Sequence, residues 1–153
     1  MKNILIFLFT ITFSTSLLAS NENLSSRSKA LVNIFNCAFY AEWLQKDDEF
    51  KVLINKGTNL GIPLIKEIKS HQLPNGNIPE EFGSKIPTVL LTTLFSSSPE
   101  FSLGMMYTTL NQVNKATIFR DEAGNLRTDS ESRKLLLQSY NESNCNKLAY
   151  PDK

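Results

Sequence analysis

The sequence predicts an all-α protein, an irregular bundle of four to six helices with one disulfide bond. The main observation is the segment 49–68, whose apolar residues recur at the i, i+3, i+4 and i+7 spacing of one helical face. A second observation is the pair Ser98-Pro99, which is typical of a helix start. The third is the pair of cysteines, Cys37 and Cys145, which lie near the two ends of the chain.

The N-terminus has the features of a secretory signal peptide. A short basic start with Lys2 precedes an uncharged, mostly apolar run from Ile4 to Leu18, and small residues follow at Ala19 and Ser20. The run is too short and too rich in Thr and Ser for a typical membrane anchor, which needs about 20 mostly apolar residues. We therefore expect residues 1–20 to be a signal peptide and residues 21–153 to be a single helical domain in the periplasm or outside the cell.

Charge excludes some classes of partner. Residues 1–20 carry one lysine and no acid, so the mature chain would have 15 basic and 15 acidic residues. The longest run of consecutive lysines or arginines is the pair Arg133-Lys134, whereas non-specific nucleic-acid binding requires clustered positive charge. We expect no nucleic-acid partner and no stable membrane insertion after cleavage; the oligomeric state stays open.

The two cysteines favour a disulfide bond if the chain is exported. A Cys37–Cys145 bond would close a loop of 108 residues (145 minus 37), which the chain-entropy model values at about 4–5 kcal/mol. The alternatives are two separate buried thiols or a bond to another molecule.

The first mature helix is expected over 27–44, with Ser25 or Ser26 as its N-cap. Its aromatic residues stand at helical spacing and are expected in the core, the alternative being a ligand platform: Phe35, Phe39, Tyr40 and Trp43.

The central helix follows, capped by Asp47 or Asp48. Gly57 and Gly61 interrupt its apolar face, which suggests close packing against another helix, since each glycine costs a helix about 1 kcal/mol. Pro63 is expected to kink the helix or to make it restart.

The segment 71–85 is the longest irregular piece, with Asn75-Gly76 as a strong turn pair. Because long loops in compact domains are often functional, this segment is the best candidate for a binding surface. The candidate binding residues are His71, Asn75, Glu80, Glu81 and Phe82.

The remaining chain is also predicted to be helical. The segment 86–95 fits a buried helix, with a buried strand as the alternative. A helix starting at Pro99 has Gly104 on or near its apolar face, which would permit a second close crossing; its expected inward residues are Phe101, Leu103, Met106, Tyr107, Leu110 and Val113. Thr128 and Glu131 are spaced as a capping box and predict a last helix over 129–145, with Leu135, Leu136 and Tyr140 inward.

Three features together resemble a group of uncharacterised, short, signal-peptide-bearing helical envelope proteins of Gram-negative bacteria. They are the run FSSSPEFSLGMM at 95–106, the FxxxxxxGxxxG pattern of residues 50–61, and the flanking cysteines. The resemblance covers most of the mature chain and implies a Gram-negative envelope location. It carries over no catalytic residue.

No motif predicts a cofactor, a metal site or a catalytic set. His71 is the single histidine, which excludes zinc sites built from two or more histidines of one chain. Neither glycine-rich nucleotide motif occurs, and there is no CxxC pair. Two carboxylates suffice for glycoside hydrolysis, so a cell-wall hydrolase using Glu80, Glu81 and Glu100 is a third possibility.

The leading hypothesis for function is a non-enzymatic exported protein that binds another envelope protein, as an inhibitor or immunity protein does. The alternative is binding of an apolar small molecule or lipid within the bundle, in a pocket lined by Phe35, Phe39, Trp43, Met105, Met106 and Tyr107.

Overall fold

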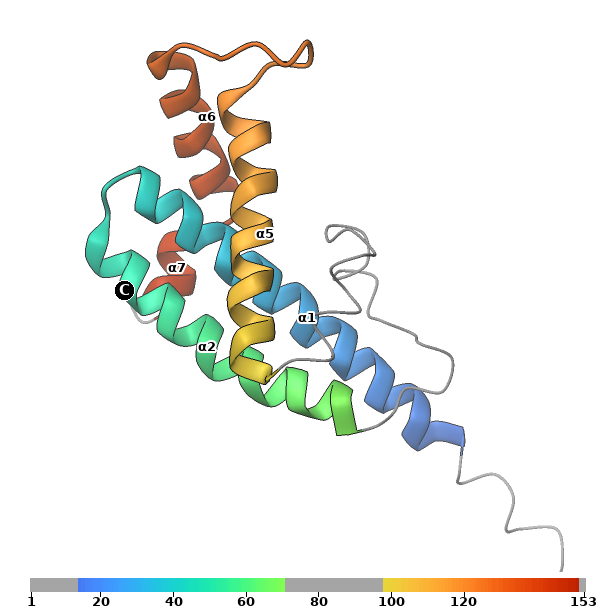
Figure 1. The fold of residues 1–153 in the computed structure, drawn as a ribbon. Helices are drawn as coiled ribbons and strands as arrows, with labels where there is room; N and C mark the ends of the chain where they lie inside the picture. Colours follow the sequence, from blue (N-terminus) through green and yellow to red (C-terminus); the bar gives the residue numbers. More distant parts are fainter. Residues whose placement is uncertain (1–13, 71–97, 152–153) are drawn as a thin grey trace, which may run out of the picture.

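The computed structural model describes residues 14–70 and 98–151, and within these ranges the protein is all-α (Figure 1). The predicted helix over 86–95 lies outside the described residues. The only pairing of extended backbone within the described part is an isolated antiparallel bridge between Arg120 and Leu126. The described helices are α1 (Ser14–Trp43), α2 (Asp47–Ser70), α5 (Pro99–Phe119), α6 (Asp129–Glu142) and α7 (Cys145–Ala149).

Helices α1 and α2 form a long antiparallel hairpin, which α5 crosses on one side (Figure 1). The hairpin turn is a Schellman motif: the Lys46 N–H donates to the carbonyl of Ala41, and the Gln45 N–H donates to the carbonyl of Glu42. Gln45 takes the left-handed conformation, with φ of 59°, at the position where glycine is most common. The turn therefore reverses the chain in three residues.

Helix α1 starts earlier than predicted. It runs from Ser14, so Ser25 and Ser26 lie within the helix and neither is its N-cap. Serine inside a helix can satisfy its hydroxyl locally, and the buried Ser28 donates to the carbonyl of Leu24 at 2.8 Å. The expected cleavage point near residue 20 lies within α1.

Helix α2 starts at Asp47, so Asp47 and Asp48 lie in its first turn and neither is the predicted N-cap; the helix does not restart at Pro63. Asp47, Asp48 and Glu49 form an acidic first turn, which suits the positive end of the helix dipole. The helix continues through Pro63 to Ser70. Pro63 is exposed, so its ring points away from the core and does not disrupt the packing of the buried face.

The predicted close packing at the two glycines of α2 is present, and each glycine accepts a side chain from a different helix. A Cβ atom built on Gly57 would lie 2.8 Å from Cδ1 of Phe35 in α1, and closer still to Cε1. A Cβ atom on Gly61 would lie 3.2 Å from Cδ2 of Leu103 in α5, and closer to Cδ1. The missing side chains thus bring α2 against both neighbouring helices.

Helix α5 starts as predicted, but some of the residues on its buried face differ from those predicted. The Ser98 hydroxyl accepts a hydrogen bond from the Phe101 N–H, and Pro99 opens the helix. Phe101 and Val113, expected inward, are 53% and 41% exposed. Ser102 and Thr109 are buried instead, and Thr109 can be buried because its hydroxyl donates to the carbonyl of Met105.

Helices α6 and α7 close the fold. The capping box of Thr128 and Glu131 is present; Leu136 and Tyr140 are buried, and Leu135 is half-buried. The predicted helix over 129–145 ends at Glu142 instead, and a short turn with Asn144 in the left-handed conformation leads into α7.

The predicted disulfide bond is present between Cys37 in α1 and Cys145 in α7, 108 positions apart. Lys56 of α2 adds a second tie, because its Nζ donates to the carbonyls of Leu148 and Ala149 at 2.8 and 3.1 Å. A lysine there complements the negative end of the α7 dipole. The C-terminal helix is therefore fixed to both arms of the hairpin.

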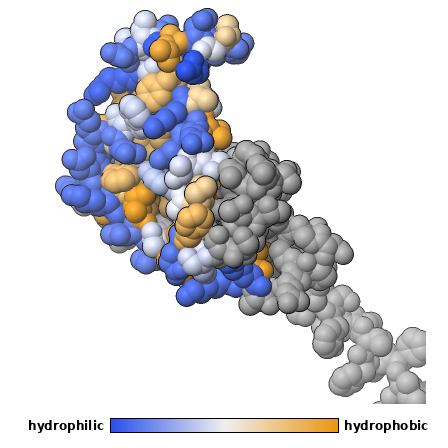
Figure 2. Space-filling model, viewed as in Figure 1, coloured by the Kyte–Doolittle hydropathy of each residue, from blue (hydrophilic) through white to orange (hydrophobic). Residues whose placement is uncertain are grey.

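None of the described helices combines the length and the apolar character that crossing a membrane requires. The face visible in Figure 2 is mostly hydrophilic, with small hydrophobic patches between the polar side chains.

Candidate functional site

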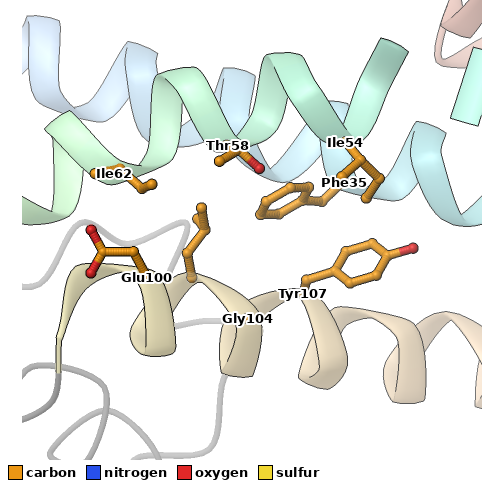
Figure 3. Close-up of a pocket in the computed structure, with 8 residues that line it drawn as sticks. Phe35, Ile54, Thr58, Ile62, Glu100, Gly104 and Tyr107 are labelled. Atoms are coloured by element: carbon orange, nitrogen blue, oxygen red, sulfur yellow. The ribbon is translucent and has the colours of Figure 1, made fainter. Parts of the chain in front are cut away.

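An apolar groove with a volume of about 250 Å³ lies where α1, α2 and α5 meet (Figure 3). Side chains of α2 form one wall and side chains of α5 form the other, with an aromatic ring of α1 between them. Its lining residues are Phe35, Ile54, Thr58, Ile62, Glu100, Leu103, Gly104 and Tyr107.

Helical spacing explains how each wall forms. Ile54, Thr58 and Ile62 are four residues apart and therefore lie in a row along α2. On α5 the lining positions are three or four residues apart as well, running from Glu100 to Tyr107. Two helical surfaces thus face each other along about two turns, or roughly 12 Å.

Gly104 keeps the groove open. A Cβ atom built on Gly104 would have no neighbour within 4 Å, so the expected close helix crossing at this glycine is wrong. The contrast with Gly61 has a geometric cause, since Leu103 of α5 already fills the space at Gly61. The same contact that holds α2 and α5 together leaves a hollow one residue further along α5.

The aromatic part of the lining is rigid. Phe35 is only 2% exposed and packs edge to face against Tyr107, with ring centroids 5.2 Å apart and an interplanar angle of 61°. Because Phe35 also fits against Gly57, its ring has little room to move. A ligand would therefore meet a preformed surface.

The two ionisable side chains of the groove lie toward its ends, and the hydroxyl-bearing Thr58 lies between them (Figure 3). Glu100 projects from the first turn of α5 near Ile62, and Tyr107 lies at the opposite end near Ile54 (Figure 3). The Tyr107 hydroxyl donates to Glu42 at 3.4 Å. Burial is the main cause that raises the pKa of Tyr107 above 10.0; the hydrogen bond with Asn111 lowers it and Glu42 raises it again. Tyr107 is therefore a neutral donor at physiological pH.

Two of the six residues that were predicted to line an apolar pocket line the groove, and the other four do not. Phe35 and Tyr107 line the groove. Phe39 and Met106 are fully buried in the core, and Met105 is partly buried against it. Trp43 is 42% exposed and packs against Phe119 at 4.6 Å between ring centroids, so it belongs to neither the core nor the groove.

The predicted loop site stays a prediction. His71, Asn75, Glu80, Glu81 and Phe82 lie outside the described residues. Of the three carboxylates considered for hydrolysis, Glu100 alone is described, and among the described residues it is the single acidic one that lines the groove.

Outside the groove, the described side chains that could carry chemistry make contacts that stabilise the fold. Tyr140 donates to Glu49, Lys46 pairs with Glu49 at 3.2 Å, and the Lys46 ammonium lies 4.8 Å from the centre of the Tyr140 ring. Both cysteines are in the disulfide bond and are therefore not available as nucleophiles. In the described ranges, no three His, Cys, Asp or Glu side chains are grouped to hold a metal ion.

Most of the α2 wall of the groove was not predicted from the sequence. Ile54, Thr58 and Ile62 form an i, i+4, i+8 row that can be recognised in the sequence. That the row borders a hollow depends on Gly104 lying opposite it, which no pattern within α2 can indicate.

No protein-family model, curated protein or solved structure matches the chain. The groove therefore has to be interpreted from its own shape and chemistry.

Proposed function

We propose that the chain is an exported, non-enzymatic protein that binds another envelope protein through the groove between α2 and α5, as an inhibitor or immunity protein would. The observation that carries this proposal is the open apolar groove at the junction of three helices. In protein–protein interfaces, the side chains that contribute most of the binding free energy typically insert into concave, apolar, preformed surfaces of the partner.

Four further features support the proposal. The signal-peptide pattern over 1–20 and the disulfide bond both suit an oxidising compartment outside the cytoplasm. The resemblance to Gram-negative envelope proteins agrees with that location. The lining is mostly aliphatic and aromatic, with few polar groups.

A small apolar molecule is the second candidate, because two predicted pocket residues, Phe35 and Tyr107, do line the groove. Sites for drug-sized ligands have volumes of about 300–1,000 Å³. At about 250 Å³ and open to solvent, this groove would enclose less of such a ligand. A side chain presented by a protein needs no such enclosure, because the surrounding interface excludes water.

The experiment is a pull-down from an envelope extract of the source organism, with the oxidised protein lacking residues 1–20 as bait. Gly104→Leu would place a branched side chain in the groove, whereas Gly104→Ala adds one methyl group to open space. We expect one stoichiometric protein on the wild-type and Gly104→Ala baits, and its loss from the Gly104→Leu bait and from reduced, unfolded bait.

Two results would contradict the proposal. Equal capture by the Gly104→Leu and Gly104→Ala baits would show that the groove is not the binding surface. An empty wild-type lane, with a small molecule extracted from the protein after exposure to the same extract, would favour the second candidate.

A further inference from the structure

We propose that the groove takes a large apolar side chain of a partner protein together with a neighbouring lysine or arginine, whose cation pairs with Glu100. This inference rests on the proposed function and specifies the chemistry of the partner segment.

The size of the groove fits one large side chain. A dry cavity of about 150 Å³ accommodates benzene, and sites for drug-sized ligands start at about 300 Å³. The groove lies between these limits at about 250 Å³. A single aromatic or long aliphatic side chain would fill most of it. It would contact Ile54 and Ile62 of the α2 wall (Figure 3) and Leu103, which α5 contributes to the lining.

The charge of the groove is negative. Glu100 contributes a carboxylate to the lining, and none of the described lysines and arginines lines the groove. Among the described residues, neither the Arg27–Glu67 nor the Lys46–Glu49 ion pair involves Glu100, and no salt bridge from a described cation to Glu100 is present. At the other end, the Tyr107 hydroxyl is directed to a second carboxylate, that of Glu42. An apolar group beside a cation is therefore complementary to the groove, and one beside an anion is not.

Glu100 also has a structural role that the test has to separate from binding. It lies in the first turn of α5, where a negative charge stabilises the helix dipole. Asp48 occupies the equivalent place in the first turn of α2 and is exposed. Asp48→Asn is thus a matched control for Glu100→Gln, because it weakens a helix start and leaves the lining of the groove unchanged.

The probes are four dipeptides, each acetylated at its N-terminus and amidated at its C-terminus: Phe-Lys, Phe-Gln, Phe-Glu and Ala-Lys. Binding to the oxidised protein lacking residues 1–20 is followed by the backbone amide shifts of α2 and α5 in two-dimensional NMR. An exposed ion pair is typically worth about 0.2–1 kcal/mol, which corresponds to about a 1.4- to 5-fold difference in Kd.

We expect Phe-Lys to bind up to about 5-fold more tightly than Phe-Gln, Phe-Glu to bind more weakly than both, and Ala-Lys to cause no saturable shifts. Glu100→Gln and high salt should each remove the difference between Phe-Lys and Phe-Gln, whereas Asp48→Asn should keep it. Gly104→Leu should abolish binding of all Phe peptides.

Different contrary results would overturn different parts of the proposal. Equal Kd values for Phe-Lys, Phe-Gln and Phe-Glu would overturn the inference about charge and leave the groove as a binding surface. A difference that persists in Glu100→Gln would also overturn it. Absence of saturable shifts in α2 and α5 with every peptide would overturn both this inference and the proposed groove function.

Discussion

Leu103 of α5 packs directly onto Gly61 of α2, and the same side chain lines the groove between these helices. The contact therefore has two consequences. It fixes the separation of α2 and α5 at one point, and it sets the depth of the hollow that Gly104 leaves open next to it. The groove therefore depends on two glycines in different surroundings. A Cβ atom at Gly61 would overlap Leu103, whereas a Cβ atom at Gly104 would project into open space.

Gly61→Ala is expected to destabilise the protein. The added Cβ would overlap Leu103, and overpacking typically costs about 1–3 kcal/mol, which exceeds the gain of about 1 kcal/mol from replacing glycine in a helix. The net loss in the free energy of unfolding should be up to about 2 kcal/mol, measured by urea denaturation.

Gly104→Ala is the matched control in the same titration. Its Cβ meets nothing within 4 Å, so the substitution adds no steric overlap. The higher helix propensity of alanine should then stabilise the protein by up to about 1 kcal/mol. If both alanine variants were stabilised to the same extent, the close packing of Leu103 on Gly61 would be wrong.

Removal of the disulfide bond should lower stability substantially. Cys37→Ala/Cys145→Ala is expected to reduce the free energy of unfolding by about 2–5 kcal/mol, because the bond closes a long loop in the unfolded chain. Urea denaturation with and without a thiol reductant provides the measurement. The reductant should destabilise the wild type and leave the double variant unchanged; a reductant effect on neither would show that the cysteines are not bonded in solution.

Tyr140→Phe should lower stability near neutral pH by about 1–2 kcal/mol, since the variant loses the hydrogen bond from the hydroxyl to Glu49. Lys46 still pairs with Glu49 in the variant, which limits the loss. Thermal unfolding of the wild type and of the variant at pH 7 would measure this loss.

The pH dependence of the same variant has a defined sign. Burial, the hydrogen bond to Glu49 and the charge of Glu49 raise the pKa of Tyr140 well above 10.0. The folded chain therefore keeps a proton that the unfolded chain loses, so this contribution is intact below about pH 10 and decreases as the pH rises beyond it. Tyr40 and Tyr107, whose pKa values burial also raises, are present in both proteins. The wild type should consequently lose stability above pH 10 more steeply than Tyr140→Phe, and parallel curves would contradict this assignment.

Much of the fold could be predicted from local sequence signals. Ser98-Pro99 and the pair Thr128 and Glu131 specify helix starts through hydrogen bonds within four residues. The cysteine pair identified the bond between α1 and α7 because two cysteines allow a single internal pairing. These features depend on few residues, so the sequence alone determines them.

Other features depend on contacts between distant residues and could not be predicted in this way. The exposure of Phe101 and the burial of Thr109 follow from how α5 crosses the hairpin, which its own periodicity does not specify. Gly57, Gly61 and Gly104 look alike in the sequence, yet two are filled by partner side chains and one borders a hollow. Most of the α2 wall of the groove was missed for the same reason, since the groove belongs to three helices together.

The measurement that tests the groove function most directly is site-specific photocrosslinking in the envelope of the source organism. Benzoylphenylalanine would replace Asn55, which is exposed on α2 three residues before Thr58, and separately Thr108, which is exposed on α5 four residues after Gly104. Both positions border the groove without lining it. Lys134, exposed on α6, is the control position.

We predict one protein adduct of the same mass from positions 55 and 108, lost when Gly104→Leu is added and kept with Gly104→Ala, and no such adduct from position 134. Adducts that form equally from all three positions, or that persist with Gly104→Leu, would contradict binding through the groove.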